Sequence, residues 1–280
     1  MKKIVSLILA LTLLAAALFA FTSCGTQKSH KIAIPNDTTN EARALKLLEA
    51  QGIITLRSGL DTTATIRDIE SNPYKIEFVE AAAETLPRIL KDVGYAIINS
   101  NYAIDAGITP FVTEGTDVSY PNIIAVKDGN QTTDKTKALV AAVNSQAVKD
   151  YINNTYKGAI VCDLTSVGDG FDSTVDYDAL AGTTIKIAAS PTPHSDILEV
   201  AKTLLATKNI TLQITEFNDY VVPNQVVESG EYDANYFQHI PYLNDFNEKN
   251  NTHIVSVLEV HHEPMGIYSD TYTSLDELKK

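Results

Sequence analysis

The same succession of strand and helix patterns occurs twice along this chain. Early on, the apolar run "KIAIP" (31–35) leads into the amphipathic stretch "TTNEARALKLLEAQG" (38–52), and later "TIKIAAS" (184–190) leads into "TPHSDILEVAKTLLATK" (192–208). In both places a second strand and helix follow, and then a third pair. Strand–helix–strand units of this kind form parallel sheets covered by helices, so the repeat predicts an α/β protein with two similar lobes.

The helix patterns carry start and stop signals that support this interpretation. Thr38 and Glu41 can form a capping box, and Gly52 stands where a helix is expected to end. In the second unit, Thr192 can cap the helix and Pro193 suits its first turn. Polar and aromatic residues gather just after the strands of both units, and ligands bind at the carboxyl ends of parallel strands. We therefore expect a ligand cleft between the two lobes.

Composition limits the kinds of partner. Hydrophobic residues make up 44% of the 280 positions, which is enough for a sizeable core. The net charge is −13, and no basic stripe follows the first few residues. Because phosphate backbones repel an acidic surface, we expect no nucleic-acid partner.

Residues 1–23 have the features of a signal peptide. Lys2 and Lys3 precede the uncharged run "IVSLILALTLLAAALFAF", and small residues stand just before Cys24. A cysteine in this position resembles the lipidation site of a bacterial lipoprotein, so residues 24–30 are expected to form a lipidated tether. The apolar run is also close to the length of a membrane span, which leaves a transmembrane anchor as the alternative. If Cys24 carries lipid, only Cys162 remains, and no intramolecular disulfide can form.

No catalytic signature is found, so we expect neither enzymatic activity nor a cofactor. The sequence lacks the glycine-rich nucleotide and phosphate motifs, the GxSxG motif and the HExxH motif. His261, His262 and Glu263 in "VHHEP" are metal-ligand types. Neighbouring residues of a strand point to opposite faces, however, so the two histidines cannot both reach one ion. We therefore predict no metal site.

Four long segments resemble the NlpA-type methionine-binding lipoproteins, the substrate-binding components of the methionine ABC importer. The segments are "AIPNDTTNEARALKLLEAQGIITL", "AIINSNYAIDAG", "EFNDYVVPNQVVESGEYDANYFQHIPYL" and "HHEPMGIYSDTYTSLDEL". The resemblance covers His30 to about Lys157 and Thr184 to Lys280. It implies a two-lobe fold like that of periplasmic binding proteins, with the ligand cleft between the lobes.

The order of these segments differs from that of the family. In the family, "KIAASPTPHSDILE" comes first and "SLDEL" leads into "AIPNDTTNE", whereas here "SLDELKK" stands last. The resemblance therefore implies circularly permuted connectivity, with descent from a tandem pair as the alternative history. Residues 31–108 would form the lobe that matches the family's second lobe, and residues 109–162 with 184–280 would form the first. Residues 163–183 would be a flexible, solvated linker between the family's old termini. A single connection, around "ITPFVTEGTDVSYPN", would then join the lobes.

The resemblance also implies which residues bind methionine. Arg43 would grip the α-carboxylate with its guanidinium fork, and Asn99 and Asn122 would bind the amino-acid backbone. An apolar pocket for the thioether, which aromatic rings favour, would be formed by Tyr220, Phe237, His239 and Tyr242. His194 lies at a helix start near the cleft. By residue type alone, Arg43 could instead be a surface residue, Asn99 a helix cap and the aromatic residues part of the core.

The implied function is that of a solute-binding protein on the extracytoplasmic face of the cell membrane, anchored through lipid on Cys24. It would capture L-methionine or a related amino acid and deliver it, without chemistry, to the permease and ATPase of an ABC importer. Two alternatives stay open. One is a non-transporting surface lipoprotein or the remnant of a rearranged gene. The other is a protein that binds another amino acid, or a metal through His253, His261 and His262.

Overall fold

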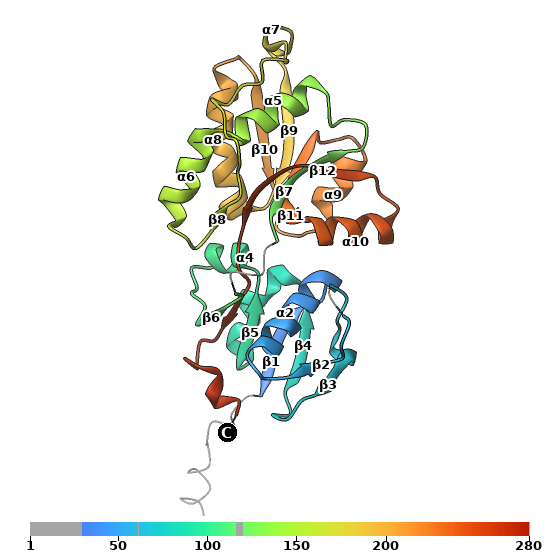
Figure 1. The fold of residues 1–280 in the computed structure, drawn as a ribbon, viewed down its shortest axis with the longest axis vertical. Helices are drawn as coiled ribbons and strands as arrows, with labels where there is room; N and C mark the ends of the chain where they lie inside the picture. Colours follow the sequence, from blue (N-terminus) through green and yellow to red (C-terminus); the bar gives the residue numbers. More distant parts are fainter. Residues whose placement is uncertain (1–29, 61, 116–119, 280) are drawn as a thin grey trace, which may run out of the picture.

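The computed structural model describes residues 30–60, 62–115 and 120–279 of the chain. They form two lobes, each built on its own sheet, which lie one above the other in Figure 1. The predicted α/β, two-lobe architecture is therefore confirmed. The predicted signal peptide and Cys24 lie outside the described residues. Within the described ranges, no helix combines the length and the apolar character that crossing a membrane requires.

The five-stranded lobe contains the first of the two repeated units. Its sheet has the order β4-β1-β5-β13-β6, in which β1 runs parallel to β4 and β5, and β13 runs antiparallel to β5 and β6. Its elements are β1 (Lys31–Pro35), α2 (Thr38–Ala50), β2 (Thr55–Leu56), η1 (Ile66–Asp68), β3 (Ile69–Ser71), β4 (Glu77–Ala81), η2 (Ala83–Thr85), α3 (Leu86–Ile89), η3 (Leu90–Asp92), β5 (Tyr95–Ile98), α4 (Ser100–Asp105), β6 (Val112–Thr113), β13 (Gly266–Tyr268) and η5 (Leu275–Glu277).

The six-stranded lobe contains the second unit. Its sheet has the order β10-β9-β11-β7-β12-β8, with β9 parallel to β10 and β11 and the other neighbours antiparallel. Its elements are β7 (Asn122–Lys127), α5 (Asp134–Val143), α6 (Gln146–Tyr156), β8 (Val161–Cys162), α7 (Tyr177–Leu180), β9 (Thr184–Ala189), η4 (Pro191–Ser195), α8 (Asp196–Ala206), β10 (Thr211–Glu216), α9 (Val222–Glu228), β11 (Ala234–His239), α10 (Ile240–Asn250) and β12 (Ile254–His262). In each lobe the repeated unit supplies the parallel strands, as predicted.

Both sheets are covered on their two faces. On β1, Ile32 and Ile34 pack in the cluster that contains Leu45 of α2, whereas Ala33 packs in the opposite cluster with Leu86 of α3. This alternation follows from the two-residue period of a strand. The central strands β1, β5 and β7 are accordingly almost entirely buried and mostly apolar, whereas β4 and β10 at the edges of their sheets keep exposed polar residues.

The helix starts differ in detail from the prediction. Asp37, not Thr38, caps α2, and its Oδ1 accepts the backbone N–H of Asn40 at 3.0 Å. Glu41 does not complete a capping box, because its Oε1 accepts the N–H of Ile66 at 2.8 Å. In the second unit, Thr192 is extended and forms no side-chain cap, and the regular helix α8 begins only after an irregular turn.

The predicted lobe boundaries are wrong for the end of the chain. Gly266–Tyr268 pairs with β5 and β6, and Tyr95 Oη donates to the carbonyl of Ser274 at 3.0 Å. Residues 109–113 and 266–279 therefore belong to the five-stranded lobe rather than to the other. The chain consequently passes between the lobes twice, from β6 to β7 and from β12 to β13. The prediction of a single connection was wrong because sheet partners distant in sequence decide where a short strand lies.

The predicted linker, residues 163–183, is not a free tether where the structure describes it. Gly168 forms an isolated bridge beside α6 and donates its N–H to the carbonyl of Asn144 at 3.1 Å. Gly170 has φ of +100°, and a Cβ built on it would lie 2.8 Å from Leu204 Cδ1. Only glycine fits this position without strain, because other residues rarely adopt such a φ. The segment is thus docked on the six-stranded lobe.

Candidate functional site

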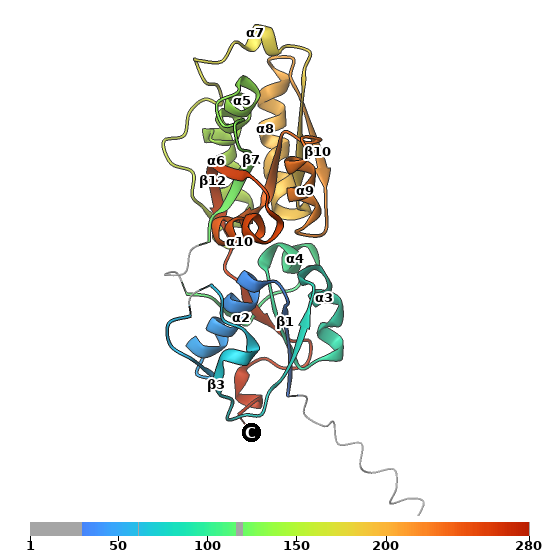
Figure 2. The ribbon, with the colours of Figure 1, turned by 90° about the vertical axis from the view of Figure 1, so that its right-hand side faces the viewer.

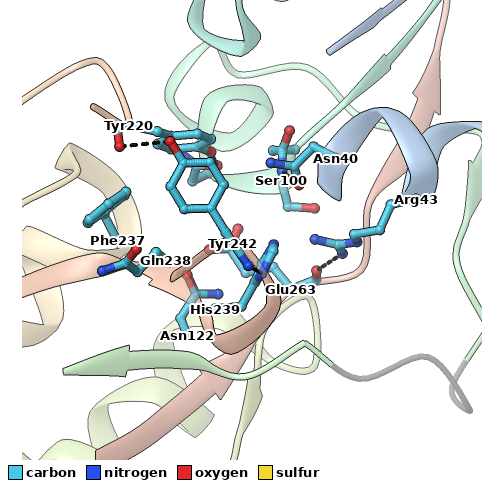
Figure 3. Close-up of a pocket in the computed structure, with 12 residues that line it drawn as sticks. Asn40, Arg43, Ser100, Asn122, Tyr220, Phe237, Gln238, His239, Tyr242 and Glu263 are labelled. Carbon is cyan, nitrogen blue, oxygen red and sulfur yellow. Dashed lines mark hydrogen bonds between the residues drawn. The ribbon is translucent and has the colours of Figure 1, made fainter. Parts of the chain in front are cut away.

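A cavity that is partly open to solvent lies where the two lobes meet (Figure 3). In this structure the side chains leave about 20 Å³ of free space, enough for about one water molecule, so a larger ligand requires the side chains or the lobes to move apart. The cavity is lined by Asn40, Arg43, Asn99, Ser100, Asn101, Asn122, Tyr220, Phe237, Gln238, His239, Tyr242 and Glu263. Helix α2 and the start of α4 contribute from one lobe, and β7, β11 and α10 contribute from the other.

The structure brings together all seven residues predicted to bind a ligand. Around this one cavity lie Arg43, Asn99, Asn122, Tyr220, Phe237, His239 and Tyr242. His194 does not line the cavity but stands behind Asn122, with its Nε2 2.9 Å from Asn122 Oδ1. Sequence reasoning missed Asn40, Ser100, Asn101, Gln238 and Glu263 as lining residues. Asn40 precedes Arg43 by three positions on α2, and residues three apart share a helix face, so this spacing could have identified it.

Arg43 is almost fully buried and already bonded along one edge. Its Nε donates to Glu114 Oε1 at 3.0 Å and its Nη2 donates to Glu114 Oε2 at 2.6 Å. Nη2 also reaches the backbone oxygen of Glu263 at 3.3 Å, and the guanidinium lies 4.3 Å from the ring centre of Tyr120. Burial opposes the charge of Arg43, but the Glu114 carboxylate outweighs it and holds the pKa of Arg43 above its ordinary value. Among the described residues Nη1 has no partner, so one terminal nitrogen, and not the whole fork, is left for a ligand.

The two predicted asparagines lie on opposite sides of the cavity. Asn99 precedes α4 but makes no capping bond, so it does not act as a helix cap. Its Nδ2 donates to Asn40 Oδ1 at 2.9 Å, and its own Oδ1 is buried without a partner among the described residues. Asn122 begins β7, where His194 holds its Oδ1. Both amides are therefore oriented before any ligand enters.

Three aromatic rings form one wall of the cavity. The Phe237 ring centre lies 5.7 Å from that of Tyr220 and 6.0 Å from that of Tyr242. Tyr242 Oη donates to the Tyr220 carbonyl at 2.9 Å, as the dashed line in Figure 3 shows. Tyr220 Oη in turn donates to Asn101 Oδ1 of the other lobe at 2.8 Å. The phenol groups thus satisfy their hydrogen bonds at the rim, and the ring faces give the cavity an apolar surface.

His239 is neutral and fixed. Its Nδ1 accepts the N–H of Tyr242 at 3.3 Å and so caps α10, and its ring lies 5.1 Å from that of Tyr120. Burial, and then the nearby charge of Arg43, lower the pKa of His239 to about 3. At neutral pH this side chain therefore contributes a ring surface without a positive charge.

The low pKa of His239 predicts a loss of stability in acid. The unfolded histidine has a pKa of about 6.5, so below that pH the unfolded chain takes up a proton that the folded chain refuses. The stability that the folded protein keeps because His239 is neutral is therefore fully present above pH 6.5. It is lost progressively as the pH falls toward 3. We expect His239→Asn, which keeps a capping acceptor, to reduce the fall in unfolding free energy between pH 7 and 5 by about 2 kcal/mol.

Urea unfolding at the two pH values measures this difference. His253 offers a matched control, because its side chain is 62% exposed. His253→Asn provides the reference for removing a histidine that the fold leaves exposed. Equal slopes for wild type and His239→Asn would contradict the assignment of a proton-free His239 in the folded protein.

A second buried cluster adjoins the cavity behind Asn122. His194, His261 and Glu263 come within 4.8 Å of one another through their ligand-type atoms. His262 does not join them, because neighbouring residues of a strand point to opposite faces. Its Nδ1 lies 2.9 Å from Asp163 Oδ1 instead. His261 Nε2 lies 3.2 Å from Glu263 Oε1, and its Nδ1 is bonded to Tyr236 Oη. The cluster is thus a hydrogen-bonded network in which Glu263 alone reaches the cavity wall.

Comparison with known proteins gives matches on both sides of the docked linker. The family model described as NlpA lipoprotein matches residues 25–163 and 185–280. The membrane lipoprotein TpN32 of Treponema pallidum (strain Nichols) is 40% identical over 134 residues, which are 46% of this chain and 50% of that protein. The D-methionine-binding lipoprotein MetQ of Yersinia pestis is 36% identical over 141 residues, 48% and 52% of the two chains. The chain spans about half the length of the curated relatives it matches.

Solved structures are similar over parts of their length. A nutrient binding protein from Burkholderia cenocepacia bound to methionine shares 42% identity at a TM-score of 0.44, over 47% of this chain and 57% of that one. A structure titled as the methionine binding protein MetQ shares 40% identity at a TM-score of 0.29, over 30% of this chain and 35% of that one.

Proposed function

This chain belongs to the NlpA lipoprotein family, and we propose that it is a solute-binding protein for methionine. In this proposal, lipid on Cys24 holds it at the outer face of the cytoplasmic membrane, and it delivers its ligand to the permease and ATPase of an ABC importer. The observation that carries the proposal is the cavity between the lobes. The seven residues that the family resemblance assigned to methionine all line it, and they come from both lobes. The methionine-binding names of the relatives support the same ligand class.

The cavity has the chemistry that methionine requires. The rings of Tyr220, Phe237 and Tyr242 suit a thioether, because each sulfur–aromatic contact is favourable by about 0.3–1.5 kcal/mol. Nη1 of Arg43 is available for the carboxylate, and Asn99 offers an unpaired Oδ1. Buried polar atoms that lack partners cost free energy, so a ligand that satisfies them is favoured over an apolar one.

Binding would proceed by closure of the lobes. Tyr220 Oη donates to Asn101 Oδ1, and Tyr102 Oη donates to the carbonyl of Asn218, both at 2.8 Å and both across the cleft. An open form would lack these bonds and expose the aromatic wall. Entry of methionine into the open cleft followed by closure is therefore sufficient for the function, and no step requires chemistry.

Isothermal titration calorimetry with L- and D-methionine tests the proposal. The protein should lack the signal peptide and be unfolded and refolded beforehand, so that no ligand from purification remains. Calorimetry is preferred because the chain has no tryptophan to report binding by fluorescence. Saturable one-site binding is expected. A refolded protein that binds neither enantiomer would support the alternative of a non-transporting surface lipoprotein.

We also propose that the family's segments are circularly permuted in this chain. The family model matches two blocks on either side of residues 164–184, whereas each curated alignment covers only about half of both proteins. An alignment that keeps the order of residues can match only one of the two exchanged blocks of a permuted chain. Permutation therefore accounts for alignments that cover half of each protein. In addition, the carbonyl of Lys31 and the hydroxyl of Ser269 both bond to Gly94, at 3.2 and 2.7 Å. The end of the chain and the start of β1 thus lie close together, as Figure 2 also shows.

A variant in the family order is expected to bind methionine as well as the natural order does. It would begin at residue 184, join residue 279 to residue 31 and end within residues 163–183. The new ends and the new junction interrupt neither of the two passages between the lobes. The lobes of this variant would therefore keep both connections. We expect dissociation constants within about threefold of each other, because surface ends that lie close together tolerate permutation. A difference of more than tenfold in calorimetry would contradict this expectation.

A further inference from the structure

Glu263 lines the cavity and carries a carboxylate oxygen without a hydrogen-bond partner among the described residues. Its side chain is 5% exposed, and Oε2 is buried without a hydrogen-bond partner among the described residues. Oε1 is held by His261 Nε2 at 3.2 Å, and His261 is held in turn by Tyr236. A carboxylate buried in this way is costly unless a cation or a donor compensates it.

The nearest arginine attracts the Glu263 carboxylate electrostatically but donates no hydrogen bond to it. Arg43 donates to the backbone oxygen of Glu263, as Figure 3 shows, while Nε and Nη2 of its guanidinium are bonded to the side chain of Glu114. Arg43 and Glu263 thus lie side by side as one cationic and one anionic group on the same cavity. The α-carboxylate and α-ammonium of an amino acid are likewise separated by a single carbon.

We propose that Glu263 binds the α-ammonium of the ligand, so that the site selects free amino acids over analogues that lack the charged amine. The inference rests on the proposed function and adds to it the group that fixes the amino end. The ammonium would donate to Oε2, and His261 with Tyr236 would keep the carboxylate turned toward the cavity.

A metal ion fits these residues less well than an ammonium group. An ion shared by His194, His261 and Glu263 would have to displace the bonds that His194 Nε2 makes to Asn122 and that His261 makes to its neighbours. The two histidines also do not line the cavity. An ammonium group needs only the oxygen that is already free.

Calorimetry with two ligands tests the assignment. L-Methionine is compared with 4-(methylsulfanyl)butanoate, which lacks the amine, on wild type, Glu263→Gln and the matched control Glu259→Gln on the exposed side of β12. In wild type we expect the amine-free analogue to bind at least about tenfold more weakly. Glu263→Gln should weaken L-methionine by a similar factor but leave the analogue within about twofold, and Glu259→Gln should change neither.

Equal weakening of both ligands by Glu263→Gln would overturn the inference, because it would indicate a purely structural role. So would unchanged affinity for L-methionine. Titration with Zn²⁺ alone tests whether a metal ion, rather than the ammonium of the ligand, compensates the charge of Glu263. Saturable Zn²⁺ binding that Glu263→Gln abolishes, together with loss of methionine binding in chelator, would assign the cation to a metal and overturn the inference. If wild type binds no methionine at all, the proposed function itself fails, which is a distinguishable result.

Discussion

Replacing Glu114 with alanine is expected to lower the free energy of unfolding by about 3–5 kcal/mol. The replacement would leave the guanidinium of Arg43 buried without its carboxylate, and both side chains are at most 6% exposed. It would also remove the acceptor of the Met265 N–H, which Glu114 Oε2 binds at 2.7 Å. Urea unfolding at pH 7 without ligand measures the effect, so that no binding energy enters the comparison.

Glu199→Ala is the matched control for this prediction. Glu199 also forms an ion pair, with Lys202 at 2.9 Å, but its side chain is 55% exposed. Exposed pairs contribute little, so this replacement should cost less than about 1 kcal/mol. Similar small losses in both variants would contradict the prediction that the buried pair contributes much more to stability than the exposed one.

The largest expected effect on binding belongs to the double variant Arg43→Met/Glu114→Gln. The other described residues that line the cavity include no lysine or arginine, so this variant removes the cation available to the ligand carboxylate. Charge-assisted hydrogen bonds contribute about 1.5–3 kcal/mol each, and 1.4 kcal/mol is tenfold in affinity. We expect L-methionine affinity in calorimetry to fall by about 100-fold or more.

Both residues are changed together so that the fold survives the test. Arg43→Ala alone would leave Glu114 as an uncompensated buried charge, whereas Glu114→Gln keeps a side-chain oxygen as the acceptor for the Met265 N–H. Replacing both members of a buried pair is often close to neutral, so stability should stay within about 2 kcal/mol of wild type. Arg57→Met, at an arginine that is 62% exposed, controls for loss of positive charge. Near-wild-type affinity in the folded double variant would refute a ligand-binding role for Arg43.

The contacts of Glu114 also link the cavity to the two passages between the lobes. Glu114 lies at the end of β6 and Met265 lies just before β13, so one carboxylate ties the two passages between the lobes to each other. Arg43 joins them to α2. Under the proposed function, a ligand bound to Arg43 would therefore act on both segments that connect the lobes.

Much of the site could be predicted because it follows local rules. Asn99 follows β5 directly, and Phe237 lies near the carboxyl end of β11, where ligands of parallel sheets bind. Asn122 begins the antiparallel strand β7 and reaches the same edge because it pairs with His239 at the end of β11. The family resemblance then assigned each residue a role. Glu114 could not be found in this way, because its partner Arg43 lies 71 positions away and no motif links them. Glu263 was considered only as a metal ligand, because its free oxygen becomes visible only in three dimensions.

The sequence by itself determined the two α/β units, since the apolar periods of strands and helices are local properties of the chain. It also determined which residue types meet at the strand ends. Only the tertiary structure decided that β13 joins the sheet of residues 31–98, that the chain therefore crosses between the lobes twice, and that Arg43 is paired with Glu114. The physical reason is the same in each case. Strand pairing and buried ion pairs depend on backbone and side-chain partners that only folding brings within hydrogen-bond distance.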